Sequence, residues 1–292
     1  MGKRFKLPRI RTLVQATATL LTNGWIPGFI NGNIFKGGSK SFCVPGLNCY
    51  SCPGALGSCP IGALQSTLTS REFKLSLYVS GFLFIIGSLL GRFVCGFLCP
   101  FGWLQELLHK IPFPKKLKKL PGEKMLRGLK YLILIFFVIL LPLFFIDATG
   151  IGKPWFCAYI CPAGTLEAGI PLVLANRALQ SVLGFLYAWK LAILFILIFL
   201  SLIIWRPFCR YLCPLGAIYG LFNPIALLRF KIDRKSCTEC GSCKRACPMA
   251  LDVMNKPNQL VCMRCGKCRE ACPTDAISLI YPFKKEKKHE AD

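Results

Sequence analysis

The feature that most constrains this chain is a cysteine pattern that occurs twice near its C-terminal end. Cys237, Cys240, Cys243, Cys247 and Pro248 read C-x2-C-x2-C-x3-C-P, and Cys262, Cys265, Cys268, Cys272 and Pro273 repeat it. Three thiolates on one short loop bind three irons of a cubane, and the fourth iron takes the last cysteine of the other copy. Tetrahedral zinc also accepts C-x2-C, but it requires neither the third cysteine nor the Cys-Pro ending. The pattern therefore predicts two [4Fe-4S] clusters with crossed ligands, Cys237, Cys240, Cys243 and Cys272 for the first and Cys262, Cys265, Cys268 and Cys247 for the second.

The segment that carries this pattern is too small to form a large apolar core. From Lys231 onward the chain is polar and rich in cysteine and lysine. A domain of this size needs additional staples, and metal clusters supply them. We predict a small α+β 2[4Fe-4S] ferredoxin-like domain over residues 231–283. Residues 284–292 are expected to form a disordered tail.

The rest of the chain is more hydrophobic than soluble domains usually are. Hydrophobic residues make up 54% of the 292 residues, and the mean hydropathy is +0.51. Apolar runs extend over residues 12–35, 75–91, 131–146 and 178–205. A helix crosses a bilayer with about 20 apolar residues, and flanking Lys or Arg can snorkel. We therefore predict an α-helical integral membrane domain over residues 1–230 with about four transmembrane helices. The first half of the segment 169–186 is predicted to be interfacial or re-entrant, and if this segment crossed the bilayer the chain would have five spans.

The positive charge of the chain is large and unevenly distributed. The formal net charge is +24, from 37 Lys and Arg against 13 Asp and Glu. The basic residues fall in blocks beside the apolar runs, as they do in cytoplasmic loops of membrane proteins, which favours this interpretation over nucleic-acid binding. The N-terminus, residues 92–130 and the region after Arg206 are the richest in positive charge. We therefore expect a multi-pass protein of the cytoplasmic membrane with both termini and the 92–130 loop in the cytoplasm.

A second cysteine pattern, C-x3-C-P-x-G-x-[LI], occurs within the hydrophobic part. Full copies begin at Cys95, Cys157 and Cys209, and a partial copy around Cys59 has Ala55 in place of its first cysteine. Cysteines four residues apart share one face of a helix, and the proline suits the first turn of a new helix. Each full copy offers two thiolates, so two copies are needed to bind one cubane. Three repeats of the same pattern indicate metal ligation rather than ordinary buried cysteines.

The predicted topology decides which copies combine. Cys95, Cys99, Cys209 and Cys213 all follow spans that end at the inner face, so we predict that they bind one inner membrane cluster. Six cysteines lie on the outer side, where one cubane needs four. The preferred ligands of this outer cluster are Cys52, Cys59, Cys157 and Cys161. Cys43 and Cys49 are then either extra ligands or a disulfide.

Together these motifs resemble those of the NapH-type membrane ferredoxins and of the related membrane parts of NosR- and MauN-like proteins. The resemblance covers nearly the whole chain. It implies about four spans, a C-terminal dicluster ferredoxin, and electron transfer between the quinone pool or cytoplasmic donors and partner redox proteins. The chain departs from the typical pattern through its third full motif and its cysteines at 43–59. This departure favours an additional cluster over quinol oxidation.

Three functions remain open at this stage. The first is a non-catalytic conduit that exchanges electrons with an extracytoplasmic redox partner, as a subunit of an oxidoreductase complex rather than a stand-alone enzyme. The second is a quinol dehydrogenase subunit, for which Glu106 and Glu167, just past the Cys-Pro motifs, are candidate proton partners of a bound quinone. The third is a metal-reducing or maturation factor.

Overall fold

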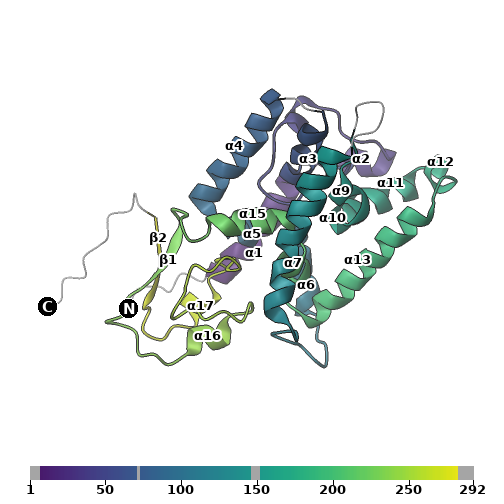
Figure 1. The fold of residues 1–292 in the computed structure, drawn as a ribbon. Helices are drawn as coiled ribbons and strands as arrows, with labels where there is room; N and C mark the ends of the chain where they lie inside the picture. The colour runs from purple at the N-terminus through teal and green to yellow at the C-terminus, as the bar shows by residue number, and fades with distance from the viewer. Residues whose placement is uncertain (1–6, 71–72, 146–151, 282–292) are drawn as a thin grey trace.

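The computed structural model describes residues 7–70, 73–145 and 152–281. These residues form a helical bundle with a small two-stranded sheet at one end (Figure 1). The expected disordered tail at 284–292 lies outside the described residues. The helices of the hydrophobic part are α1 (Leu7–Thr22), α2 (Ile26–Asn31), η1 (Gly38–Ser41), α3 (Pro60–Ser70), α4 (Phe73–Leu90), α5 (Phe93–Phe97), α6 (Pro100–Lys110), α7 (Glu123–Ile133), η2 (Leu134–Leu140), α8 (Leu141–Phe144), α9 (Trp155–Tyr159), α10 (Pro162–Gly164), η3 (Thr165–Gly169), α11 (Ile170–Ala175), α12 (Arg177–Gln180), α13 (Phe185–Ile203), α14 (Pro207–Tyr211) and α15 (Pro214–Phe222).

Every Cys-Pro pair of the second pattern starts a helix. Pro60, Pro100, Pro162 and Pro214 are the first residues of α3, α6, α10 and α15. Proline suits this position because its fixed φ matches the helix and its missing N–H would have no partner inside the helix. The prediction of a new helix after each Cys-Pro is confirmed, and in the three full copies the cysteine before the proline lies where two helices meet.

Two helical segments are long and apolar enough to cross a membrane, 123–144 and Phe185–Ile203. The first runs continuously through α7, η2 and α8, and the second is α13. The apolar stretches 77–90 and 162–175 are shorter. Of the about four predicted spans, two are therefore helices long and apolar enough to cross a membrane, and the others are shorter apolar segments.

The first predicted span is wrong as a single helix. The run 12–35 divides at Thr22, where α1 ends, and α2 begins only at Ile26. Arg11 and Gln15 of α1 are 4% and 1% exposed, so this helix presents polar side chains to the protein interior. The segment 169–186 is divided into α11 and α12 at Asn176, whose backbone is extended, whereas Pro171 lies in the first turn of α11.

The cysteine-rich tail lies at one end of the bundle (Figure 1). Its strands β1 (Arg229–Ile232) and β2 (Ile277–Ile280) pair antiparallel, with Phe230 opposite Leu279. Two short helices, α16 (Ser242–Ala246) and α17 (Lys267–Glu270), follow the two cysteine loops. Gly241 and Gly266 begin them with φ of 70° and 83°, a left-handed conformation that glycine adopts without strain. The short helices α5 and α15 lie between this tail and α3 at the far end (Figure 1).

Candidate iron–sulfur sites

The first tail site combines cysteines from both copies of the ferredoxin pattern. Cys237, Cys240, Cys243 and Cys272 all line one cavity of the tail. Cys243 interacts electrostatically with Cys237 and with Cys272, although Cys272 follows it by 29 positions in the chain. The Cys240 side chain is exposed. This arrangement has the crossed ligand geometry that a dicluster domain requires, with one ligand at the surface.

The second tail site lies deeper. Cys247 interacts electrostatically with Cys265, and Cys268 interacts with Cys265, Cys262 and Cys247. Burial raises the pKa of the Cys262 thiol to about 12. A thiol with this pKa stays protonated at neutral pH, and a metal ligand must be a thiolate, so cluster binding has to displace the proton.

The inner site consists of Cys95, Cys99, Cys209 and Cys213, which the fold brings together from α5, α14 and the starts of α6 and α15. Cys213 interacts electrostatically with each of the other three. All four are buried, with at most 6% exposure. Gln105 joins the two motif copies, because its Nε2 donates to Cys209 Sγ at 3.3 Å and its Oε1 accepts from the Phe208 N–H at 3.1 Å. The predicted inner ligands therefore form one buried group of four thiols.

Two buried arginines cross over between the motif copies of the inner site. Arg92, before the first copy, donates to the Cys209 carbonyl at 2.7 Å, and Arg206, before the other copy, donates to the Cys95 carbonyl. Neither side chain is exposed. The motif glycines leave room for the guanidinium groups, since a Cβ at Gly102 would lie 2.9 Å from Arg206 Nη1 and one at Gly216 would lie 3.0 Å from Arg92 Nη2.

The inner site also has buried donors that the protein itself does not satisfy. Within the described residues, Arg92 Nε, Arg206 Nη2 and Lys130 Nζ have no hydrogen-bond partner. All three side chains interact electrostatically with cysteines of the inner site. Buried N–H groups normally have acceptors, and the sulfur atoms of a [4Fe-4S] cluster accept hydrogen bonds. Four thiols surrounded by cations and unsatisfied donors fit an anionic iron–sulfur cluster.

The spacing of the thiols bears on the kind of metal site. No group of three His, Cys, Asp or Glu side chains in the described part of the chain is arranged to hold a metal ion. The four thiolates around a cubane bind four different irons, so they lie farther apart than those around one tetrahedral zinc ion. The absence of a single-ion site in the described residues is therefore compatible with a cluster at these thiols.

The outer site repeats this geometry with one change of ligand. Gln65 stands where Gln105 stands in the inner site, with Nε2 donating to Cys157 Sγ at 3.3 Å and Oε1 accepting from the Phe156 N–H at 3.0 Å. Cys161 interacts electrostatically with Cys157, Cys49 and Cys59. A Cβ at Gly164 would lie 3.6 Å from Cys49 Sγ. The structure thus gathers Cys49, Cys59, Cys157 and Cys161, which we call the outer site.

Cys49, and not the expected outer ligand Cys52, is among the main electrostatic neighbours of Cys157 and Cys161. The two cysteines lie in one turn, closed by the Cys52 N–H and the Cys49 carbonyl at 3.1 Å. The main electrostatic neighbours of Cys52 are Glu167 and Lys40. Cys43 contacts Ser58 instead. All 18 cysteines, each of which lies in the described part of the chain, are free thiols, so the suggested disulfide between Cys43 and Cys49 is not formed.

The two carboxylates proposed for quinone chemistry have other contacts. Glu106 forms ion pairs through both oxygens, with Arg11 Nη2 at 2.7 Å and with Arg206 Nε at 2.9 Å. Glu167 accepts the backbone N–H of Cys49 at 2.7 Å. Glu106 is thus a fixed counter-charge of the inner site, and Glu167 is part of the outer site. Sequence reasoning missed Arg92, Arg206, Gln65 and Gln105, although the arginine precedes the first cysteine by three residues in two copies of the pattern.

The buried position of Glu106 leads to a stability prediction. Replacing Glu106 with Gln leaves two buried guanidinium groups without their counter-charge, and breaking a buried ion pair in this way costs about 3 kcal/mol or more. We expect E106Q to lower the thermal unfolding midpoint of the purified protein. The exposed Glu270→Gln serves as the matched control and should leave the midpoint unchanged. Equal midpoints for the two variants would remove the structural role assigned to Glu106.

The second tail site packs directly on the inner site. A Cβ at Gly96, between the two inner cysteines of its motif, would lie 2.5 Å from the Met263 carbonyl, so only glycine permits this approach. Met263 Sδ accepts from Arg206 at 3.6 Å. Arg264 donates to the Leu90 carbonyl at 2.8 Å and to the Asn223 carbonyl at 2.6 Å. The loop between Cys262 and Cys265 is therefore anchored on the hydrophobic part of the chain.

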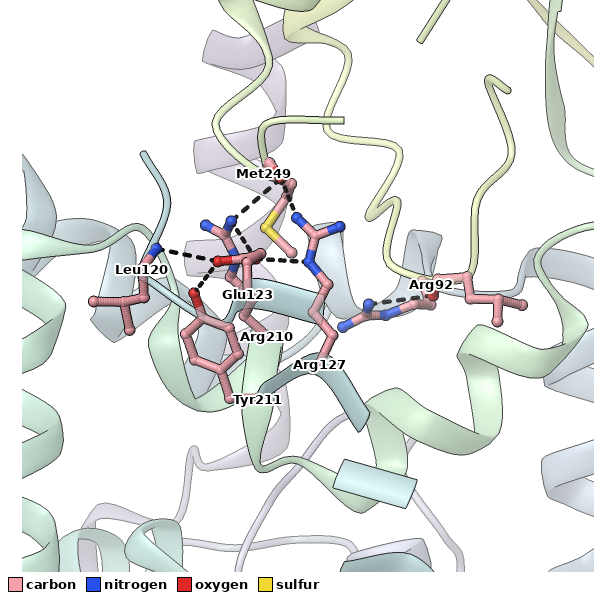
Figure 2. Close-up of polar contacts among 8 residues, drawn as sticks. Arg92, Leu120, Glu123, Arg127, Arg210, Tyr211 and Met249 are labelled. Carbon is pink, nitrogen blue, oxygen red and sulfur yellow. Dashed lines mark hydrogen bonds and ion pairs between the residues drawn. The ribbon is translucent and has the colours of Figure 1, made fainter. Parts of the chain in front are cut away.

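A polar cluster centred on Glu123 holds the other tail loop in place (Figure 2). Glu123 accepts from Arg127, Arg210 and Tyr211 at 2.6–2.7 Å. The same two arginines donate to the Met249 carbonyl, at 2.7 Å from Arg127 and 3.4 Å from Arg210. Since Met249 follows Cys247 by two residues, this cluster fixes the segment of the tail that contributes the crossed ligand.

The inner and outer sites are also neighbours. A Cβ at Gly46 would lie 3.0 Å from the Cys99 Cα, so the loop that carries Cys43 and Cys49 packs against the inner motif. Tyr219 donates to the Pro45 carbonyl at 3.2 Å and interacts electrostatically with Cys95 and Cys59. One buried side chain thus lies within range of both sites.

Comparisons with known proteins agree with this division of the chain. A family model described as a 4Fe-4S binding domain matches residues 75–121, 131–172 and 187–235, and each match contains one full Cys-x3-Cys-Pro motif. A model described as a 4Fe-4S dicluster domain matches residues 229–273. No solved structure matches the chain.

Several characterised and uncharacterised proteins are similar in sequence. An uncharacterized protein of Methanocaldococcus jannaschii is 32% identical, over 69% of this chain and 77% of its own length. The methylamine utilization ferredoxin-type protein MauN of Methylobacillus flagellatus is 31% identical, over 65% of this chain and 60% of its own length. The ferredoxin-type protein NapH of Haemophilus influenzae is 29% identical, over 59% and 52%. The alignments thus cover little more than half of the two ferredoxin-type relatives.

Proposed function

The chain belongs to the family of ferredoxin-type 4Fe-4S proteins that includes NapH and MauN, and from this premise we propose that it conducts single electrons between its tail and the far end of its hydrophobic domain. The clusters supply one-electron carriage when bound. The four sites follow one another in a fixed order, from the first tail site through the second tail site and the inner site to the outer site. It has the character of an electron-transfer subunit of a larger oxidoreductase complex.

The observation that carries this proposal is the contact of each site with the next. The crossed cysteines join the two tail sites. The Met263 backbone lies against Gly96 of the inner motif. The loop before Cys49 lies against Cys99, and Tyr219 lies within range of both the inner and the outer site. A soluble ferredoxin needs no such series, whereas a protein that carries charge through its interior does.

The proposed setting is the cytoplasmic membrane. Two helices are long and apolar enough to cross it, and the exposed residues at 115–119 include Lys115, Lys116, Lys118 and Lys119. Positive loops of this kind remain on the cytoplasmic side and contact anionic lipid headgroups. The tail, which docks beside this loop through the Lys118 hydrogen bond to the Arg245 carbonyl, then faces the cytoplasm. The outer site faces a redox partner on the other side.

The experiment is electron transfer across a sealed vesicle. The full chain, purified anaerobically, is inserted into liposomes that contain a soluble cytochrome, and dithionite is added outside. We expect the enclosed cytochrome to become reduced with the unaltered chain and to remain at the protein-free level with Cys213→Ala, because the inner site then lacks one ligand. The tail clusters of this variant should still bleach when reduced. Transfer that survives Cys213→Ala would refute the conduit.

The quinol dehydrogenase alternative has no comparable support in the structure. Both oxygens of Glu106 are engaged by arginines, so this carboxylate is not available as the proton partner of a quinol. The same liposomes give a direct test, since a quinol dehydrogenase would reduce its clusters with a quinol analogue in place of dithionite.

A further inference from the structure

The inner and outer sites share the same arrangement of cysteine motifs, glutamine contacts and helix starts, so their differences can be compared position by position. In both, a glutamine from one motif donates to the first cysteine of the facing motif at 3.3 Å, Gln105 to Cys209 and Gln65 to Cys157. In both, a helix begins at the proline after the last cysteine of each motif. The two sites therefore share their glutamine contacts and helix starts, and they differ in one ligand, because Cys49 replaces the first cysteine of the partial copy.

The two sites differ at the residue that lies seven positions before the cysteine of each Cys-Pro pair. The inner site has Arg92 and Arg206 there, whereas the outer site has Cys52 and Pro154. Each inner arginine donates to the carbonyl of a ligand cysteine across the site. In the outer site a lysine takes over one of these bonds, because Lys190 Nζ donates to the Cys157 carbonyl at 3.2 Å. Among the described residues, the second bond from a cation to the carbonyl of a ligand cysteine has no counterpart.

The outer site has a carboxylate in its place. Glu167 lies six residues after Cys161, where the inner motifs have Gln105 and Tyr219, and it accepts the Cys49 N–H at 2.7 Å. The other charges near the outer site are those of Lys190 and of Lys40, which is within electrostatic range of Cys49 and Cys52. The inner site has Arg92 and Arg206, and the carboxylate described there, Glu106, is shared between Arg206 and Arg11. With Arg11 counted, three arginines and one carboxylate lie at the inner site against two lysines and one carboxylate at the outer site, so the charge facing the inner site is more positive.

We propose that Arg92 and Arg206 raise the reduction potential of the cluster at the inner site above that of the cluster at the outer site. Reduction adds one electron to a cluster and leaves it more negative by one charge. Buried positive groups stabilise that charge more strongly than groups in water do, because the interior screens charges weakly. Arginine keeps its charge at any physiological pH. Charge and hydrogen bonds to cluster sulfur are known to set such potentials, and Glu167 acts in the opposite direction at the outer site.

This inference rests on the proposed function, since it assumes that both sites bind clusters. Its consequence is that, within the hydrophobic domain, an electron is most stable on the cluster of the inner site. An electron on the outer site passes downhill to the inner site, and the reverse step requires a strongly reducing supply from the tail. Arg92 and Arg206 are positioning residues in this scheme, because they touch the ligand backbone and not the partners of the chain.

The test is a redox titration of the full chain in detergent under anaerobic conditions, followed by electron paramagnetic resonance. The variants are Arg206→Gln, Arg92→Gln and Glu167→Gln, and Cys213→Ala identifies the signal of the inner site by its loss. We expect each arginine variant to lower the potential of the inner signal alone. Glu167→Gln, which introduces the residue present at Gln65 and Gln105, should raise the potential of the outer signal alone.

Iron content separates the possible failures. If the unaltered chain carries iron for the tail clusters only, the proposed function fails. If all clusters are present and the arginine variants leave the inner potential unchanged or shift every signal equally, the inference fails. Where Arg206→Gln loses iron, Arg206→Lys keeps the charge and should retain the original potential, and the Glu167→Gln titration then decides. An outer potential that falls in Glu167→Gln would contradict the proposal independently.

Discussion

Replacing Cys49 with serine will remove about four irons per chain, whereas replacing Cys52 will leave the iron content unchanged. A cubane contains four irons and needs four thiolates, and the structure places Cys49 beside Cys59, Cys157 and Cys161. Cys49 and Cys52 share Glu167 and Lys40 as electrostatic neighbours, but only Cys49 is among the main neighbours of Cys157 and Cys161. The two residues lie in the same turn, so the pair of variants separates ligation from general damage to the loop.

Iron and acid-labile sulfide are measured per chain in anaerobically purified protein. We expect about 16 irons for four clusters in the unaltered chain, about 12 in Cys49→Ser and about 16 in Cys52→Ser. The Cys49 variant should also fail to reduce a cytochrome enclosed in liposomes. A loss of iron from Cys52→Ser with none from Cys49→Ser would restore Cys52 as the fourth outer ligand. About 8 irons in the unaltered chain would mean that the hydrophobic domain binds no cluster.

Replacing Arg264 with asparagine will weaken the attachment of the tail to the rest of the chain while leaving both tail clusters in place. Arg264 is 1% exposed, and its guanidinium donates to the Leu90 and Asn223 carbonyls. Hydrogen bonds from charged donors contribute about 1.5–3 kcal/mol each, so the loss of both weakens docking by about 3–6 kcal/mol. Arg264 has a φ of 50°, a conformation that asparagine tolerates better than most residues.

Two measurements follow this change. Hydrogen exchange should become faster around Asn223 and in the loop from Cys262 to Cys265, and electron transfer from the reduced tail to the inner site should become slower. The matched control is Arg234→Asn, which removes an exposed arginine that donates to the Met254 carbonyl, within the tail, at 3.0 Å. Unchanged transfer in the Arg264 variant, with loosened docking, would show that the contact at Met263 is not part of the electron path.

Several features of the sites follow from spacing alone. The crossed tail ligands could be predicted because three cysteines on one loop cannot reach the fourth iron of a cubane. The helix starts at Pro60, Pro100, Pro162 and Pro214 could be predicted because they depend on the conformation of proline itself. The pairing of the motifs at Cys95 and Cys209 followed from their expected positions relative to the membrane.

Other features depend on contacts between segments that are far apart in the chain. Cys49 and Cys52 are equally plausible ligands by sequence, and only the neighbours that the fold gives Cys49, among them Cys157 and Cys161, distinguish them. Glu106 is a candidate proton partner by position, but Arg11 and Arg206 approach it from other helices. The apolar run 12–35 looks continuous until the buried Arg11 and Gln15 show that α1 faces the protein interior.

The sequence by itself therefore determined the chemistry of this protein, that of thiolate-bound [4Fe-4S] clusters, because ligand type and local spacing are properties of short segments. The tertiary structure alone decided which cysteines share the outer site, which charges surround each site and how the tail attaches to the rest. Those properties arise from electrostatic and hydrogen-bond contacts such as Arg206 with Cys95 and Arg264 with Asn223. Contacts of this kind form only when distant segments meet, so no local pattern encodes them.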